Sequence, residues 1–394
     1  MTGGIDRSKL LAGASVVAIA LAGCSLGDQT TTNQAQIGTR SSDKRAAVKL
    51  GFPATATRNT IRVGGGDAIT DAAGVASALF PATGQANRPT AALLVDQGSW
   101  QDAISASVLA GPPIDAPILL TDGSKLPPVT KDTLKRLKPR GSDLSKDAQV
   151  VRVGEGTARP SGFRTAVLPG KDPYERAAAI DRFYSAAKGK ASPDVVVVSG
   201  EKPEFALPAA AWASRGGDSV LPVKHDSVPA PIVGALRSHS KPNIYVLGPP
   251  SVIGPKVVAT LSQIGRVRRI EGRGAVRNSV VFARYKQGRF GWGVVVPGYN
   301  FTLANTDRPA DAAAAASLAT RGVYAPLLLT DSASHLPKPL DDYLRAVQPG
   351  FEGDPGDAVY NRVWLLGDDK AVSLAEQARI DQITELVPVQ ANAP

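Results

Sequence analysis

The chain has 394 residues, of which 43% are hydrophobic and 20% are charged, enough for a buried core and more than one domain. A formal charge of +10 and an isoelectric point near 9.7 favour anionic partners. Aromatic residues make up only 5%, which argues against a carbohydrate-binding β-sandwich lined by Trp and Tyr and suits a layered α/β protein.

The N-terminal residues have the plan of an export signal. A short basic region precedes an apolar stretch over residues 10–22, which is too short to span a membrane comfortably. The tetrapeptide LAGC at residues 21–24 resembles the bacterial lipobox, and this resemblance implies cleavage before Cys24 and attachment of a diacylglycerol to it. Cys24 is the only cysteine, so it cannot form an internal disulfide.

We therefore expect a lipoprotein signal peptide at residues 1–23 and a membrane anchor at Cys24, on the extracytoplasmic face of the cell membrane. The alternative is a general signal peptide with an incidental thiol. Export also argues against nucleic acid as the partner of this basic chain. Residues 24–47 are polar and lack aromatic side chains, so we expect a flexible tether there.

Internal repetition dominates the remainder of the chain. Residues 117–122 read PILLTD and residues 326–331 read PLLLTD. Each is preceded by an Ala-rich helical stretch that begins with an aspartate, and each is followed by Leu-Pro, a helix and an apolar strand ending in glycine. A degraded copy between them has VLPV at residues 220–223. The spacing predicts three modules, at residues 48–155, 156–272 and 273–394.

Short apolar runs alternate with helical segments in each module. In the first we expect strands at residues 60–63, 91–95, 118–121 and 149–153, and helices at residues 71–80, 102–110 and 131–137. The second and third modules have Val-rich runs at residues 194–198 and 293–296, which we also expect to be strands. Apolar runs without alternation indicate parallel strands covered on both faces. The order predicts right-handed crossovers and three tandem α/β modules, each a doubly wound parallel sheet.

These motifs resemble the cell wall-binding repeat type 2 family of Gram-positive surface proteins, over residues 58–380. The resemblance implies three modules around a pseudo-three-fold axis and non-covalent attachment to anionic wall polymer. It implicates in that attachment Pro117, Ile118, Leu119, Leu120, Pro326, Leu327, Leu328 and Leu329. The second copy departs from the pattern, because Phe205 replaces the aspartate found at Asp102 and Asp311.

The motif residues also have the pattern of buried strands, and leucine cannot pair with phosphate. We therefore expect ligand contacts in the loops just past the carboxyl ends of these strands, where open α/β sheets bind ligands. The loop candidates are Thr121, Asp122, Lys125, Thr330, Asp331 and His335.

Two basic clusters are further candidates for contact with a polyanion. One contains Arg266, Arg268, Arg269, Arg273 and Arg277, and the other contains Lys131, Lys135, Arg136, Lys138 and Arg140. Guanidinium groups suit phosphate oxygens, so the arginine cluster is favoured. The alternatives are an inter-repeat connection for the arginine cluster and a solvated helix face for the other.

The sequence lacks the pattern of an enzyme. His225, His239 and His335 have no metal-ligand spacing, and the only thiol is the expected lipidation site. We attribute Asp102 and Asp311 to helix N-capping. Residues 64–67 read GGGD and suit a tight turn better than a phosphate loop. We expect no catalytic residue, no cofactor and no metal.

The leading interpretation is a non-enzymatic, membrane-anchored lipoprotein that binds an anionic envelope polymer and bridges membrane and wall. One alternative is the solute-binding lipoprotein of an importer, which requires two lobes around one cleft. Another is a wall-glycan hydrolase or transferase, which requires titratable groups converging in one cleft.

Overall fold

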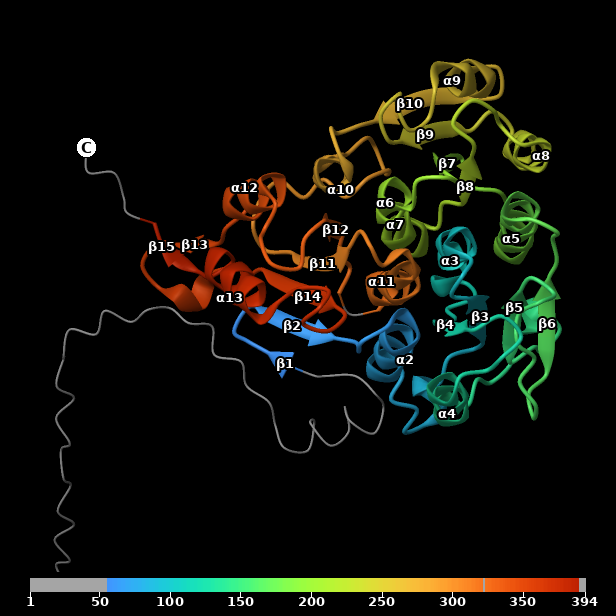
Figure 1. Cartoon of the computed structure of the whole chain (residues 1–394), viewed down its shortest axis with the longest axis horizontal. Helices are drawn as coiled ribbons and strands as arrows, with labels where there is room; N and C mark the ends of the chain where they lie inside the picture. Colours follow the sequence, from blue (N-terminus) through green and yellow to red (C-terminus); the bar gives the residue numbers. More distant parts are fainter. Residues whose placement is uncertain (1–54, 322, 390–394) are drawn as a thin grey trace, which may run out of the picture. The chain divides into compact units, whose positions relative to one another are not determined.

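The computed structural model describes residues 55–321 and 323–389 (Figure 1). The expected signal peptide, Cys24 and the expected tether lie outside the described residues. None of the described helices is both long and apolar enough to cross a membrane.

Three parallel sheets of four strands share one strand order. In the first, β3 (Ala92–Asp96) lies between β4 (Ile118–Thr121) and β5 (Val150–Val153), and β6 (Thr165–Leu168) pairs with β5. The second repeats this order with β8 (Val220–Val223), β7 (Asp194–Ser199), β9 (Asn243–Leu247) and β10 (Arg266–Ile270). The third has β12 (Leu327–Thr330), β11 (Asn300–Asn305), β14 (Arg362–Leu366) and β2 (Thr60–Val63). The expected doubly wound α/β class is confirmed.

The third sheet is completed by a strand from the other end of the chain. Residues 363–366 of β14 pair in parallel with residues 60–63 of β2, and β1 (Thr55–Ala56) adds an antiparallel strand at that edge. The sheets therefore do not follow the predicted module boundaries. Residues 60–63, predicted in the first module, belong to the third sheet, and residues 165–168, predicted in the second, belong to the first sheet.

The helix after each fourth strand packs on the second strand of the next sheet. These helices are α2 (Ala68–Leu79), α5 (Pro173–Lys188) and α10 (Ala275–Arg284), and they contact β4, β8 and β12, respectively. Consecutive modules are thus interlocked, because a strand in one sheet leads directly to a helix on the next.

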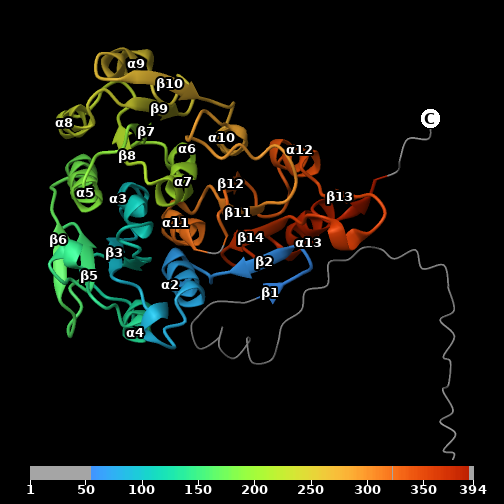
Figure 2. The same ribbon diagram turned by 180° about the vertical axis from the view of Figure 1, so that it is seen from behind.

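Helices that follow the first strand of each sheet meet one another (Figure 2). They are α3 (Trp100–Ala106), α7 (Pro208–Gly216) and α11 (Ala312–Thr320), and each contacts the other two. Short helices adjoin them: η2 (Ser107–Ala110), α6 (Pro203–Ala206) and η4 (Pro309–Asp311). The alanines at 312–316 are fully buried, and small side chains allow such helices to approach closely.

The remaining elements lie outside this helical centre. They are α4 (Pro128–Leu137), α8 (Ala230–Ser238), α9 (Pro255–Ser262), α12 (Lys338–Ala346), α13 (Leu374–Ile383), the paired β13 (Gly350–Phe351) and β15 (Val387–Pro388), and the short helices η1 (Gln85–Asn87), η3 (Asp143–Ser145) and η5 (Pro355–Asp357).

One predicted strand is wrong. Residues 293–296 form a loop, in which Val295 and Val296 are about half exposed, and the first strand of the third sheet is instead β11. Gly293 has a positive φ and Pro297 follows the run, so this backbone is not suited to a sheet centre. In β11, by contrast, residues 301–305 are all buried.

Candidate functional site

The first strand of each sheet in chain order, β3, β7 or β11, ends in the same local structure. Asp96, Ser199 and Asn305 each accept a hydrogen bond from the backbone N–H two residues later, over 3.3, 3.1 and 3.0 Å. Each is the last residue of the first strand of its sheet, which connects to its neighbour on one side, whereas the adjacent third strand connects to its neighbour on the other side. This switch point is the usual ligand position in doubly wound sheets.

The motif strands themselves are core. The side chains of Ile118, Leu119 and Leu120 are fully buried, and the leucines at 327–329 are at most 1% exposed. Pro117 and Pro326 are also buried. These eight family-motif residues therefore shape the loops that follow them and cannot themselves touch a polymer in this conformation.

In the first sheet, the candidate residues form a tight turn. Lys125 N–H donates to the Asp122 carbonyl over 2.9 Å, and the Thr121 hydroxyl is buried against the Gly123 carbonyl. Asp122 and Lys125 are exposed and line a shallow hollow of about 680 Å³ with Asp96. Thr121 positions the turn, and only Asp122 and Lys125 are free to meet a ligand.

The third sheet has a similar turn with different side chains. Thr330 is buried and donates to the Ser332 carbonyl over 2.8 Å, while Ser332 Oγ lies 2.7 Å from Nδ1 of the exposed His335. Asp331 is exposed. The two sets of loop candidates lie on different sheets, so each belongs to a site of its own module.

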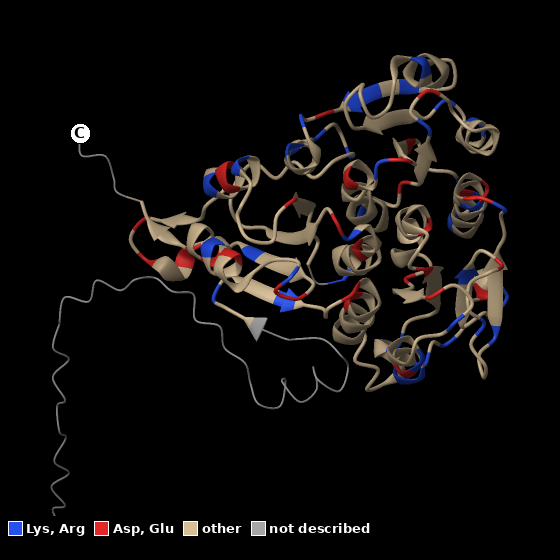
Figure 3. Cartoon of the chain, in the orientation of Figure 1, with Lys and Arg blue, Asp and Glu red and all other residues tan. Residues whose placement is uncertain are grey.

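The arginine cluster lies along the edge strand β10 and the loop after it (Figure 3). Arg266 and Arg268 are exposed, whereas Arg269 is tied to the carbonyls of Gly248 and Ile253 over 2.6 and 2.9 Å. Burial lowers the pKa of Arg269. Arg273 and Arg277 line a separate hollow of about 570 Å³ at the start of α10. Four of the five arginines thus remain available to a polyanion.

The second basic cluster lies on α4 and the residues after it. Lys131, Lys135, Lys138 and Arg140 are exposed, but Arg136 is partly buried and burial lowers its pKa. Four of its five residues are therefore exposed, as in the arginine cluster.

A buried charge network lies at the switch point of the third sheet. Arg308 Nε donates to Asp311 Oδ2 over 2.8 Å, and Arg308 Nη2 donates to Asp71 on α2. Both carboxylates are fully buried. Burial, reinforced by the neighbouring Asp311 carboxylate and opposed by Arg308, raises the pKa of Asp71 to about 9. The Arg308 guanidinium thus donates to both carboxyl groups. Because it supplies one positive charge for two buried carboxyl groups, the pair is most stable when one proton is shared between them.

The first sheet carries a reversed arrangement at the same place. Asp102, the counterpart of Asp311, accepts from Arg176 Nε over 2.7 Å, and Arg176 occupies the position on α5 that Asp71 occupies on α2. Ser99 stands where the third module has Arg308. The cation that pairs with the aspartate thus comes from the loop after the first strand in the third sheet (Arg308) and from the helix after the fourth strand in the first sheet (Arg176).

In the second sheet, both the aspartate position and the equivalent position on the helix after the fourth strand carry uncharged residues. Phe205 stands at the aspartate position, and Asn278 stands where α2 and α5 have Asp71 and Arg176. Asn278 Oδ1 accepts from the Gly272 N–H over 2.9 Å, as Asp71 accepts from Gly65. The paired loss indicates that each module either satisfies this buried position with a complete ion pair or avoids charge there.

The structure corrects the N-cap interpretation of Asp102 and Asp311. Asp311 occupies the N-cap position of α11, whereas Asp102 lies in the first turn of α3, which begins after Ser99. Neither side chain makes a capping hydrogen bond. Arg176 was missed because no local spacing links Asp102 to a residue on α5. Arg308 lies three residues before Asp311, and that spacing was the one local signal for this pair. By contrast, the turn at residues 64–67 is confirmed, with Gly64 at a φ of +126° and Asp67 capping α2.

The histidines do not form a group. Among the residues that the structure describes there is no cluster of three or more potential metal ligands. His239 is buried, with Nδ1 2.7 Å from the Ser192 carbonyl oxygen and Nε2 2.9 Å from Asp181 Oδ1. A carbonyl can only accept, so Nδ1 donates, and Nε2 donates as well when the ring is an imidazolium. His239 therefore has a structural partner.

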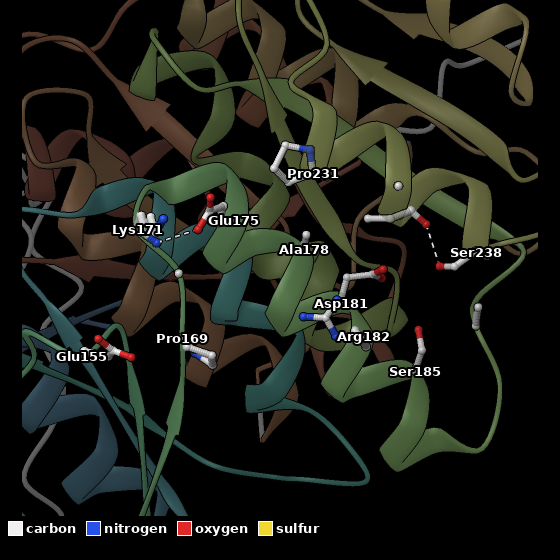
Figure 4. Close-up of a pocket in the computed structure, with 14 residues that line it drawn as sticks. Glu155, Pro169, Lys171, Glu175, Ala178, Asp181, Arg182, Ser185, Pro231 and Ser238 are labelled. Carbon is white, nitrogen blue, oxygen red and sulfur yellow. Dashed lines mark hydrogen bonds between the residues drawn. The ribbon is translucent and has the colours of Figure 1, made fainter.

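A hollow lies between α5 and α8 (Figure 4). It measures about 900 Å³ and has small residues such as Ala178 and Gly234 in its lining. Charged residues of both signs line it, including Lys171, Glu175 and Arg182. The Glu175 carboxylate accepts a hydrogen bond from the backbone N–H of Lys171 over 2.9 Å. It therefore offers no concentrated positive charge for a polyanion.

Comparison with known proteins identifies two repeats. Residues 62–160 and 168–258 match the family model described as cell wall binding domain 2 (CWB2). Each matched region starts in the fourth strand of one sheet and runs through the third strand of the next. The second region is matched although its motif is degraded, and these matches do not extend into the third copy.

Solved structures with the same fold include two proteins from Clostridium difficile. Cwp6 has a TM-score of 0.62 at 18% identity, covering 86% of this chain and 49% of that chain. Cwp8 has the same TM-score and identity, covering 86% of this chain and 53% of that chain. This chain thus spans about half the length of each. No curated protein matches the sequence.

Proposed function

We propose that this chain is a cell wall binding domain 2 protein throughout its three sheets and that it binds an anionic polymer of the cell envelope without catalysis. The observation that carries the proposal is the repetition of one strand order in three sheets, two of which belong to segments that match the family. The third sheet has equivalent helices at equivalent contacts, which supports its inclusion.

The polymer contacts that we propose are exposed groups just past the carboxyl ends of β4 and β12, and along the edge strand β10 and the loop after it. Asp122, Lys125, Asp331 and His335 lie past β4 and β12, and Thr121 and Thr330 hold the turns. On the second sheet, Arg266, Arg268 and Arg273 supply the cations, with Arg269 bracing the edge. Guanidinium groups pair well with phosphate and carboxylate oxygens.

The resemblance of residues 21–24 to a lipobox supports a further part of the proposal, in which Cys24 carries a lipid and residues 24–47 tether the body to the membrane. A chain with both attachments would bridge membrane and wall. Metabolic labelling with a fatty-acid analogue tests this: we expect label on the wild type and none on Cys24→Ser, whereas equal labelling would contradict it.

Co-sedimentation of the purified full-length chain with isolated walls tests polymer binding. We expect binding to intact walls, loss after the anionic polymers are removed, and weakening with salt because exposed charge pairs are screened. Arg266→Ala/Arg268→Ala should weaken binding more than Arg182→Ala/Arg237→Ala, which removes two exposed arginines from α5 and α8. Equal binding to intact and stripped walls would contradict the proposal.

A further inference from the structure

The segment between α10 and β11, residues 285–299, is longer than the equivalent connections, which are residues 80–91 after α2 and residues 189–193 after α5. In a chain with 5% aromatic residues, residues 282–301 contain Phe282, Tyr285, Phe290, Trp292, Tyr299 and Phe301. No acidic residue occurs between Glu271 and Asp307, although five basic residues do. This concentration of aromatic and basic groups is not needed to connect a helix to a strand.

Part of the aromatic cluster is buried and rigid. Phe290 stacks on Tyr245 with ring centroids 3.5 Å apart, and Trp212 on α7 packs edge-on against Phe290 and Trp292 at 5.0 and 5.4 Å. These contacts fix the path of the segment. They also hold Trp292 at the wall of a hollow of about 490 Å³ on the side of the third sheet where β11 begins.

Exposed aromatic rings stand at the rim of this hollow. Tyr299 is 39% exposed and Tyr324 is 51% exposed. The guanidinium carbon of Arg215 lies 4.5 Å from the Tyr324 ring centroid, which orients the ring and the cation together. The buried Nε1 of Trp292 has no hydrogen-bond acceptor among the described residues.

All of the charged residues that line the hollow are cations. Arg289 is fixed by Asp194 and Asp218 over 2.7 and 2.6 Å and remains 46% exposed. Lys286 Nζ donates to the Gly291 carbonyl over 3.1 Å, which leaves other donor positions open. Arg215 makes no ion pair with a carboxylate in the described part of the chain.

We propose that this hollow, lined by Trp292, Tyr299, Tyr324, Arg215, Lys286 and Arg289, is a saccharide-binding subsite that takes one sugar unit carrying a carboxylate or a phosphate. Aromatic faces stack on the apolar face of a sugar ring, while the cations pair with its anionic substituent. The inference rests on the proposed function in that the natural ligand is a unit of the same polymer. It adds a ring-specific subsite away from the carboxyl edges of the sheets.

Tryptophan fluorescence of the full-length chain provides the readout, because Trp212 and Trp292 flank the hollow. Trigalacturonate and glucose 6-phosphate each combine a ring with an anion. Maltotriose supplies the ring alone, and inorganic phosphate supplies the anion alone. We expect at least one ring-bearing anion to bind ten or more times tighter than both controls. The inference is overturned if neither does.

Matched variants locate the binding. Arg215→Ala and Tyr324→Ala should each weaken binding of the ring-bearing anion about tenfold. Arg182→Ala and Tyr360→Ala, which remove an exposed arginine and an exposed tyrosine elsewhere, should leave it unchanged. Equal effects of both pairs would overturn the inference. Wall sedimentation run in parallel separates the outcomes: a chain that binds walls but no ring-bearing anion refutes the subsite alone, and one that binds the sugar but no walls refutes the proposed function.

Discussion

At the residue scale, the buried pair of Asp71 and Asp311 gives the folded chain a proton that the unfolded chain does not hold. The folded pKa of Asp71 is raised to about 9 from an ordinary value of 3.8, first by burial and then by Asp311. Because the folded chain binds this proton more tightly than the unfolded chain, proton binding contributes its full stabilisation at pH values below the unfolded pKa. This contribution to the free energy of unfolding is lost as the pH rises to the folded pKa.

We therefore predict that the wild type loses stability relative to Asp71→Asn as pH rises from 4 to 9. The amide keeps an acceptor for the Gly65 N–H, as Asn278 does for Gly272, and it has no proton to lose. Urea unfolding across this pH range measures the difference. Parallel stability curves for the two proteins would contradict the shared proton.

The pKa of His239 is also raised in the folded chain, but by a different cause. Although burial alone lowers the pKa of His239, its hydrogen bond and charge interaction with Asp181 raise it above 6.5 overall. Its contribution should be complete below the unfolded pKa and disappear as pH rises through the folded pKa.

We predict that His239→Gln is less stable than the wild type and that the gap is widest below pH 6.5. The gap should narrow at alkaline pH, because the neutral imidazole no longer pairs with the Asp181 carboxylate. Thermal unfolding at pH 5 to 9 measures it. A gap that is the same at every pH would show that His239 acts through packing alone.

At the scale of elements, α5 is attached to α3 by one charge pair. Arg176→Met leaves Asp102 buried without its cation, and breaking a buried pair in this way costs about 3–5 kcal/mol. We predict that Asp102→Asn/Arg176→Met is more stable than Arg176→Met alone, because no buried charge then lacks a partner. Urea unfolding of both variants measures this. A double variant that is less stable than the single would contradict the pairing.

The elements most reliably predicted from sequence were those fixed by local pattern. Strands 60–63 and 118–121 match the structure because uninterrupted apolar runs end at turn residues. The predicted strand at residues 293–296 was wrong because Gly293 has a positive φ and because Val294 hydrogen-bonds to Ala283 on α10 and to Tyr343 on α12, not to a neighbouring strand. The link from Asp102 to Arg176 could not be predicted, since it depends on how α5 crosses the sheet.

At the scale of the whole molecule, the pairing of β2 with β14 closes the series of modules. Residue Arg62 of β2 is buried and donates to the carbonyls of Gly367 and Val372 over 3.0 and 2.6 Å. Sequence repetition predicted three units from anchors at residues 117, 220 and 326. Their spacing cannot reveal that the strand at the start of a unit pairs with the sheet of another unit, as β2 does with the third sheet and β6 with the first.

We predict that deletion of residues 1–66 exposes the edge of β14 and accelerates hydrogen exchange in the third sheet. The first and second sheets should change less, because their fourth strands remain. Deletion of residues 1–47 is the control and should leave exchange in residues 300–366 unchanged. Fast exchange in both deletions, or in neither, would contradict the closure.

Polymer binding is tested most directly by the affinity of the full-length chain for purified anionic wall polymer, measured by titration calorimetry at several salt concentrations. We predict saturable binding that weakens steadily as salt rises and that is impaired by Arg266→Ala/Arg268→Ala. Binding that ignores both salt and these arginines, or no binding at low salt, would contradict it.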